Sequence, residues 1–186
     1  MVLRTEGVRL SSRFRRQLRR STWQVRADTA FDSVIAACAS TPRAGQDGTW
    51  ITGDMQAAYR ELHRLGHAHS VEVFDPGPSG ESRLVGGIYG VAIGRMFFGE
   101  SMYSGESGGS KVALAALAFR LREWGWPLID AQVENPHLSS LGAESWPRSL
   151  FLEKVELLTG LPETPAGWSL RFGTLPAAAL AEVRSD

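Results

Sequence analysis

The amino-acid sequence predicts one domain of mixed α/β class (α+β), in which helices flank a largely antiparallel sheet. Two patterns carry this prediction. Apolar residues recur with helical spacing up to about residue 65 and alternate with polar residues from residue 70, and the alternating stretches follow one another with short connections. The length of 186 residues supports a single core of ordinary size.

The first predicted helix begins near Ser11 or Ser12, either of which can cap it. Leu10, Phe14 and Leu18 form a narrow apolar stripe, and the other faces are rich in arginine. The first 26 residues hold eight arginines and one glutamate, a formal +7, so the other residues carry −7 within a net charge of zero. Such a cluster is usually a solvated face; the alternative is a contact surface for nucleic-acid phosphates.

Two further helices are expected before the strands begin. One covers residues 29–39, and residues 42–48 after it form a loop. The next opens at Thr52 and ends near Leu65, where Gly66 supplies the left-handed residue typical of a helix C-terminus.

Period-two alternation then predicts an antiparallel meander of three strands. The strands cover residues 70–74, 84–93 and 96–100, joined by a Pro/Gly-rich connection over 75–82 and a tight turn at 94–95, and a loop of small residues follows over 101–109. The remaining elements are a helix over 111–124 beginning at Ser110, a strand over 128–133, a short helix from Asn135–Pro136 to Gly142, a helix over 150–158 and a last strand over 168–172.

Composition and spacing exclude several kinds of protein. A single cysteine, Cys38, excludes an internal disulfide and a cysteine-based zinc cage. Membrane-spanning and signal-peptide patterns are absent from the sequence, so we expect a cytoplasmic protein. His63, His67 and His69 have no carboxylate or cysteine at ligand spacing, and we expect no metal site. The Gly-rich stretch 105–111 does not fit a phosphate loop, although a loop before a helix N-terminus can bind an anion weakly.

Asp130 and Gln132 are the most informative polar residues. On a strand they would share one face, and neither belongs in an apolar strand without a reason. Asp130 can act as a general base, with Gln132 orienting it; the alternative is that the pair satisfies local backbone groups. Glu100 closes the neighbouring predicted strand in the same way, so two acids would form a site attractive to cations.

Eight blocks of the sequence, in order, resemble one family. The blocks are GTWIT at 48–52, LGHAHSVEV at 65–73, GGIYGVA at 86–92, FGESM at 98–102, SK at 110–111, LIDAQV at 128–133, HLSSLGA at 137–143 and PR at 147–148. Together they resemble the leucyl/phenylalanyl-tRNA–protein transferases. The resemblance implies a catalytic domain similar to the acyl-CoA N-acetyltransferase fold, and a reaction that moves Leu or Phe from a charged tRNA onto an N-terminal Arg or Lys, creating a degradation signal.

The resemblance also implies roles for individual residues. Asp130 and Gln132 would assist the attack of the acceptor amine, and Glu100 would help to recognise the basic acceptor side chain. The donor side-chain pocket would be lined by Trp50, Ile88, Phe97, Met102, Leu114, Leu117 and Ile129. The tRNA would contact Arg13, Arg15, Arg16, Arg19 and Arg20.

Partners and domain limits follow from the same resemblance. Aminoacyl-tRNA would be the co-substrate with no other cofactor, no metal and no membrane, and the acceptor would be a protein or peptide N-terminus or a small-molecule amine. Residues 1–26 would form a basic helical arm and residues 27–186 the catalytic domain. Family members carry a further N-terminal segment, and Ile88 and Leu117 replace a common Met and Phe. A relative that aminoacylates a small molecule, and a non-catalytic tRNA-binding adaptor, therefore remain alternatives.

Overall fold

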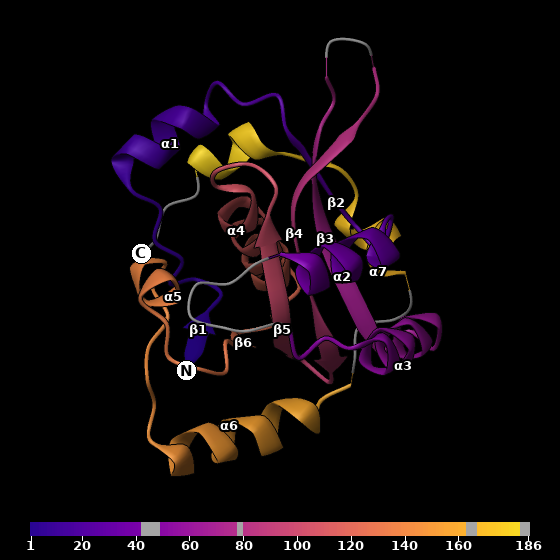
Figure 1. The fold of residues 1–186 in the computed structure, drawn as a ribbon. Helices are drawn as coiled ribbons and strands as arrows, with labels where there is room; N and C mark the ends of the chain where they lie inside the picture. The colour runs from indigo at the N-terminus through magenta and orange to yellow at the C-terminus, as the bar shows by residue number, and fades with distance from the viewer. Residues whose placement is uncertain (42–48, 78–79, 163–166, 183–186) are drawn as a thin grey trace.

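The computed structural model describes residues 1–41, 49–77, 80–162 and 167–182. Within these residues one seven-stranded sheet has the order β1-β6-β5-β4-β3-β2-β7 (Figure 1). Every neighbouring pair is antiparallel except β5 and β6, which run parallel. The predicted mixed class with largely antiparallel pairing is therefore confirmed. The loop predicted over 42–48 lies outside the described residues.

The predicted meander forms the middle of the sheet. Its strands are β3 (Ala68–Asp75), β4 (Arg83–Ile93) and β5 (Met96–Ser104). The loop predicted to begin at residue 101 is wrong in its first part, because Ser101–Ser104 continues β5 in register with Gly86–Tyr89. Cross-strand pairing outweighs the low strand preference of these small residues.

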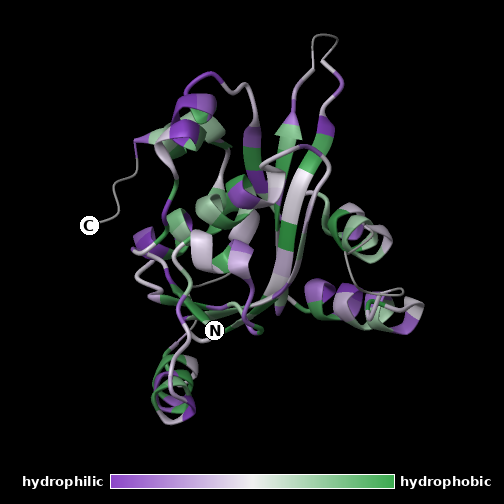
Figure 2. Ribbon diagram, turned by 60° about the vertical axis from the view of Figure 1, so that its left-hand side comes forward, coloured by the Kyte–Doolittle hydropathy of each residue, from purple (hydrophilic) through white to green (hydrophobic). Residues whose placement is uncertain are grey.

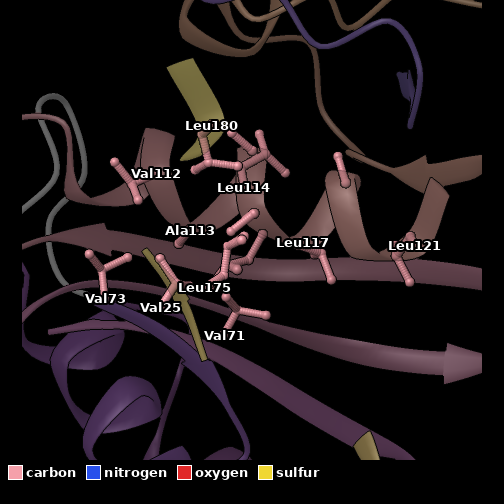
Figure 3. Close-up of a cluster of buried hydrophobic side chains, with 14 of the residues drawn as sticks. Val25, Val71, Val73, Val112, Ala113, Leu114, Leu117, Leu121, Leu175 and Leu180 are labelled. Carbon is pink, nitrogen blue, oxygen red and sulfur yellow. The ribbon is translucent and has the colours of Figure 1, made fainter. Parts of the chain in front are cut away.

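Helices cover the two faces of the sheet. Helix α4 (Gly109–Glu123) packs its apolar residues against Val25, Val71 and Val73 on one face (Figure 3). On the other face α2 (Phe31–Ser40) and α3 (Gly53–Arg64) pack around Tyr89 and Tyr103. Figure 2 shows both hydrophilic and hydrophobic colours on the helices, as expected for elements with one buried face.

The start of α4 lies directly against β4. A Cβ atom added to Gly86 would lie 2.4 Å from the carbonyl carbon of Gly109, and one added to Gly109 would lie 2.2 Å from the carbonyl oxygen of Val85. Only glycine at both positions permits this approach of helix to strand. The contact fixes where α4, and the side chains it buries, lie along the sheet.

Three strands were not predicted: β1 (Val2–Arg4), β2 (Gln24–Ala27) and β7 (Leu175–Pro176). They have two to four residues each, too few for a period to show. With α1 (Ser12–Leu18), β1 and β2 carry the arginine-rich N-terminus into the common sheet. The division at residue 26 stays a prediction.

The last predicted strand is wrong, because residues 168–172 form the helix α7 (Trp168–Phe172). Trp168 and Phe172 are four residues apart and both pack on the core, while Leu170 between them is 87% exposed. The apolar–polar alternation of the five residues fits a strand, but in a strand Leu170 would share a face with Trp168 and Phe172, and its exposure fits only the helix. A 3-10 helix, η1 (Ala177–Ala181), follows β7.

The other helices and the short strand agree with the prediction in position. They are β6 (Leu128–Asp130), α5 (Pro136–Ser140), whose predicted N-cap Asn135 accepts from the His137 amide at 2.8 Å, and α6 (Arg148–Thr159). Helix α6 packs Leu158 against Met96 and Leu128. No helix within the described ranges has the length and apolar character that a membrane crossing requires.

Candidate active site

Glu100 lies in a β-bulge of β5. Tyr89 of β4 pairs with Ser101, and the next residue, Gly90, pairs with Gly99, so Glu100 is the extra residue. A bulge turns its side chain out of the regular alternation and is common beside active sites. Glu100 accordingly lies toward α3, near the hydroxyl of Tyr59. Burial and the Glu100 carboxylate raise the pKa of Tyr59.

Asp130 and Gln132 are brought together by a turn rather than by a strand. Strand β6 ends at Asp130, so the predicted strand over 128–133 is too long. Gln132 has a φ of 58°, and its amide donates to the Asp130 carboxylate at 2.8 Å. An Asp side chain that binds the amide two residues on is a turn-forming contact, and here it stabilises a left-handed residue that is not glycine. The shared strand face predicted for the two side chains is therefore wrong, and the contact that joins them runs from the Asp130 carboxylate to the main chain of Gln132.

Gln132 also connects the two acids. Its side-chain amide donates to the Glu100 carboxylate at 3.3 Å, while its backbone amide donates to Asp130. Sequence analysis placed the two acids at neighbouring strand ends, and the structure links them through one residue. A left-handed non-glycine residue at such a point is typical of a functional site.

The site lies where two strands separate. β5 and β6 are paired only from Met96 to Phe98, and among the described residues no strand continues the pairing on this edge of β5 beyond Phe98, although β4 still pairs with the other edge. A Cβ added to Gly99 would lie 3.2 Å from the carbonyl oxygen of Asp130. Glu100 and Gln132 therefore stand on opposite sides of the point where the sheet opens.

Tyr59 is a site residue that sequence analysis missed. Sequence analysis placed it only within the helix expected between Thr52 and Leu65. Its ring packs edge-on against Tyr89, with 5.2 Å between ring centroids, while its hydroxyl reaches Glu100. The bulge that brings Glu100 to it leaves no pattern in the sequence.

The residues predicted to line the donor pocket fall into two groups. Six of them share the core cluster that includes α4: Ile88, Phe97, Leu114, Leu117 and Ile129 are buried in it, and Met102 packs against it. Trp50 lies elsewhere. It is 42% exposed, and its ring lies edge-on to Tyr59 at 6.4 Å, on the side of Glu100.

The predicted tRNA-binding arginines also fall into groups, which differ in their contacts. Arg13, Arg16 and Arg20 line a cavity of about 580 Å³ together with Trp23. Arg15 instead donates to the carbonyl oxygens of Leu10 (3.1 Å) and Ala181 (2.9 Å). Arg19 pairs with Glu182 at 3.0 Å, where both side chains are more than half exposed.

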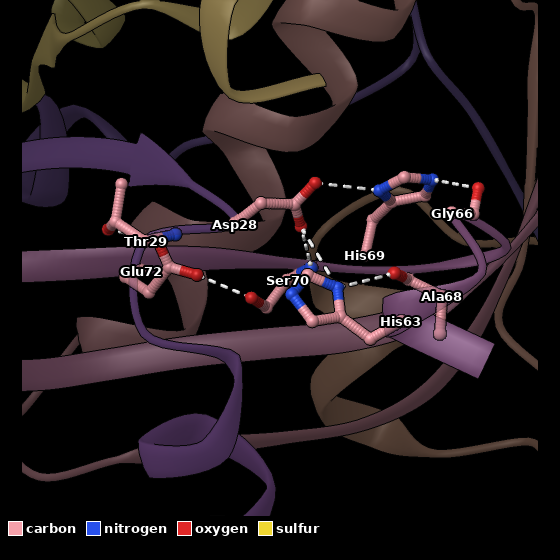
Figure 4. Close-up of polar contacts among 8 residues, drawn as sticks. All are labelled: Asp28, Thr29, His63, Gly66, Ala68, His69, Ser70 and Glu72. Atoms are coloured by element: carbon pink, nitrogen blue, oxygen red, sulfur yellow. Dashed lines mark hydrogen bonds and ion pairs between the residues drawn. The ribbon is translucent and has the colours of Figure 1, made fainter. Parts of the chain in front are cut away.

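Two residues of the histidine motif, His63 and His69, belong to a compact polar cluster at the start of β3 (Figure 4). His69 lies between the Asp28 carboxylate (2.7 Å) and the Gly66 carbonyl (3.1 Å), and His63 lies 2.8 Å from the Ala68 carbonyl. Each ring nitrogen of His69 thus faces an oxygen atom that can accept a hydrogen bond. Among the residues that the structure describes, no group of three His, Cys, Asp or Glu is arranged to hold a metal.

The comparison that decides the family is a match to its model. Residues 2–156 match the model described as leucyl/phenylalanyl-tRNA protein transferase. The chain belongs to this family. The resemblance seen in the eight blocks is thereby confirmed.

Individual relatives agree with the family assignment. A leucyl/phenylalanyl-tRNA–protein transferase of Xanthomonas euvesicatoria pv. vesicatoria (strain 85-10) is 70% identical over 184 residues, which are 99% of this chain and 72% of that protein. One of Xylella fastidiosa (strain M23) is 62% identical over 92% of this chain and 69% of that protein. A solved structure of AAC(6')-Iy with a bisubstrate analogue aligns with a TM-score of 0.37 and 14% identity, over 79% of this chain and 95% of that one.

All three polar residues of this transferase-family site lie inside the matched range. So do α1 and α4, whereas α7, β7 and η1 follow it. The C-terminal elements nevertheless bury Phe172, Leu175 and Leu180 in the same core as α4. The structure therefore adds a segment to the fold that the family match does not reach.

Proposed function

We propose that this chain transfers an aminoacyl group from a charged tRNA to the α-amine at the N-terminus of an acceptor protein, with Glu100, Asp130 and Gln132 as its central residues. The observation that carries the proposal is the Gln132 bridge between the two acids at the opening of the sheet. Family membership supplies the class of reaction. A charged tRNA is a cytoplasmic substrate, so the reaction belongs in the cytoplasm.

The chemical step replaces an ester with an amide. The acceptor nitrogen attacks the ester carbonyl, a C–N bond forms, and the C–O bond to the terminal ribose breaks. The amine loses one proton and the ribose oxygen gains one. An aminoacyl ester is already activated, so the protein mainly positions two substrates and carries this proton. The Asp130 carboxylate is the group suited to the proton, and the Gln132 amide orients the amine.

Glu100 supports recognition of the acceptor. A carboxylate next to the attacking amine favours a cationic acceptor side chain through a charge-assisted hydrogen bond, which fits an N-terminal Arg or Lys. The Gln132 amide donates to Glu100 and helps to hold it in place, and the Tyr59 hydroxyl lies near it.

The donor end is supported by two other surfaces. The five buried pocket residues on the α4 side, with Met102 packed against them, form an apolar environment for a leucyl or phenylalanyl side chain. The cavity lined by Arg13, Arg16 and Arg20 offers guanidinium groups to the tRNA backbone without base recognition.

Transfer of labelled Leu or Phe from charged tRNA to an Arg-initiated peptide tests the proposal. Asp130→Asn keeps an oxygen that can accept the Gln132 amide but removes the charge, and should lower turnover by roughly 10²-fold with tRNA binding kept. Glu100→Gln should raise the KM for Arg-initiated peptides most. Glu153→Gln, on the exposed side of α6, is the matched control. Unchanged turnover in Asp130→Asn would mean that Asp130 does not carry the proton. A wild-type protein that binds tRNA but transfers nothing would be a tRNA-binding adaptor instead.

A further inference from the structure

The five arginines in and directly after α1 differ in their surroundings. Arg13, Arg16, Arg19 and Arg20 are exposed, whereas Arg15 is half-buried. Arg16 faces the cavity beside Trp23, and Arg15, its neighbour in the chain, points to main-chain oxygens. Two adjacent residues of the same type thus have different contacts.

We propose that Arg15 is a positioning residue, which fixes α1 on the C-terminal segment so that the cavity arginines can bind tRNA; the inference rests on the proposed function. Its Nε donates to Leu10, the residue before the N-cap of α1, at 3.1 Å. Its Nη1 donates to Ala181 of η1 at 2.9 Å. One planar guanidinium thereby joins the start of α1 to the end of η1.

Helix α1 needs such an attachment, because it buries little of itself. It has seven residues, all described, and Leu18 alone is buried. So short a helix is not stable in isolation. Phe14 packs on the loop before α4, where a Cβ on Gly108 would lie 2.7 Å from its ring. The orientation of the arginine face therefore depends on contacts made by neighbouring segments.

The C-terminal segment, residues 168–182, is suited to be the fixed partner. Ala177, Leu180 and Ala181 of η1 are buried in the main core, and β7 pairs with β2. The Ala177 amide also donates to the Trp23 carbonyl at 2.9 Å, and Trp23 lines the arginine cavity. The segment thus holds α1 through Arg15 and the cavity wall through Trp23.

The chemistry of the side chain separates positioning from phosphate binding. Lysine keeps the charge but has no planar fork to donate to two separate carbonyls. A phosphate contact depends on charge, and each one lost reduces the slope of log K against log salt by about 0.7–0.9. Arg15 and Arg16 can therefore be compared as Lys and as Met variants.

The test measures hydrogen exchange of α1 in the tRNA-free protein, and tRNA affinity and steady-state transfer over a range of salt. In Arg15→Lys we expect exchange in α1 to rise and the KM for aminoacyl-tRNA to rise about tenfold, with kcat and the salt slope kept. In Arg16→Lys we expect hydrogen exchange of α1 to be unchanged and most of the tRNA affinity to be kept. Arg16→Met should lose affinity and salt slope together, with unchanged exchange.

Two outcomes overturn the inference. The first is that hydrogen exchange in α1 is equally fast in Arg15→Lys and in Arg16→Lys. The second is that Arg15→Met reduces the salt dependence of tRNA binding while α1 stays protected from exchange, because Arg15 is then a phosphate contact. If the wild-type protein binds no tRNA, the proposed function fails, while the exchange comparison still decides whether Arg15 holds the helix.

Discussion

Glu72 is a carboxylate in the interior of β3, with no exposed surface. Thr29 donates to it from its amide (3.3 Å) and its hydroxyl (2.8 Å), and the Ser70 hydroxyl contacts the other oxygen. Burial, with a smaller contribution from Asp28, raises the pKa of Glu72 to about 7. The folded state thus holds a proton on Glu72 that the unfolded chain releases near pH 4.5.

This shift predicts a stability that depends on pH. Because the folded-state pKa exceeds the unfolded one, the contribution of Glu72 is full below about pH 4.5 and is lost as pH rises to about 7. Glu72→Gln imitates the protonated form, so it should stabilise relative to wild type by roughly 3 kcal/mol at pH 8 and by much less at pH 5. Urea unfolding of both proteins at the two values measures the difference. An equal difference at both would contradict the raised pKa.

Gln132 combines a backbone cost with a side-chain role. Its φ of 58° is unfavourable for a residue with a Cβ and neutral for glycine. Gln132→Gly should therefore be more stable than Gln132→Ala, by about 1 kcal/mol, and both should lose transfer activity because the amide that reaches Glu100 is gone. Thermal unfolding and turnover, compared between the two variants, separate the effects. Equal stabilities would show that the turn changes conformation in the variants.

At the scale of elements, hydrophobic periodicity predicted the long helices and strands and missed the short ones. Helices α2, α3, α4 and α6 and the meander were predictable, because each shows several periods of its pattern. The bulge at Glu100 and the turn at Gln132 depend on one residue each, so the sequence showed which polar residues matter but not how they meet. Residues 168–172 were assigned to the wrong element, since Trp168 and Phe172 satisfy both periods.

Trp168 anchors the short helix α7 to the rest of the protein. Its ring stacks on His69 with centroids 4.1 Å apart and planes 6° apart, and it meets Trp124 edge-on at 5.1 Å. Trp168 is half-buried, so Trp168→Ala should cost roughly 2 kcal/mol, less than the about 3–5 kcal/mol for a fully buried aromatic ring. Leu170→Ala on the same helix is the control; Leu170 is 87% exposed and should change stability by less than about 0.5 kcal/mol. Chemical denaturation measures both, and equal effects would exclude the aromatic anchor.

At the scale of the whole molecule, the zero net charge conceals a strong separation of charge. The first 26 residues carry +7, and the structure concentrates part of this charge at one cavity. The acids of the candidate active site lie at the opening between β5 and β6. A protein that holds a polyanion and a cationic acceptor at once needs such a separation, which a net charge does not report.

The separation predicts that the position of charge, not its sum, decides tRNA binding. Replacing Arg13, Arg16 and Arg20 by Glu should abolish measurable tRNA affinity in a filter-binding assay at about 0.15 M salt, with stability nearly unchanged because all three are exposed. Replacing Arg60, Arg64 and Arg95 by Glu alters the net charge equally, and Arg60 and Arg64 form exposed pairs of small energetic value. This control should keep most of the affinity. Equal losses in the two triple variants would mean that tRNA responds only to overall charge, and the cavity on α1 would have no special part in binding.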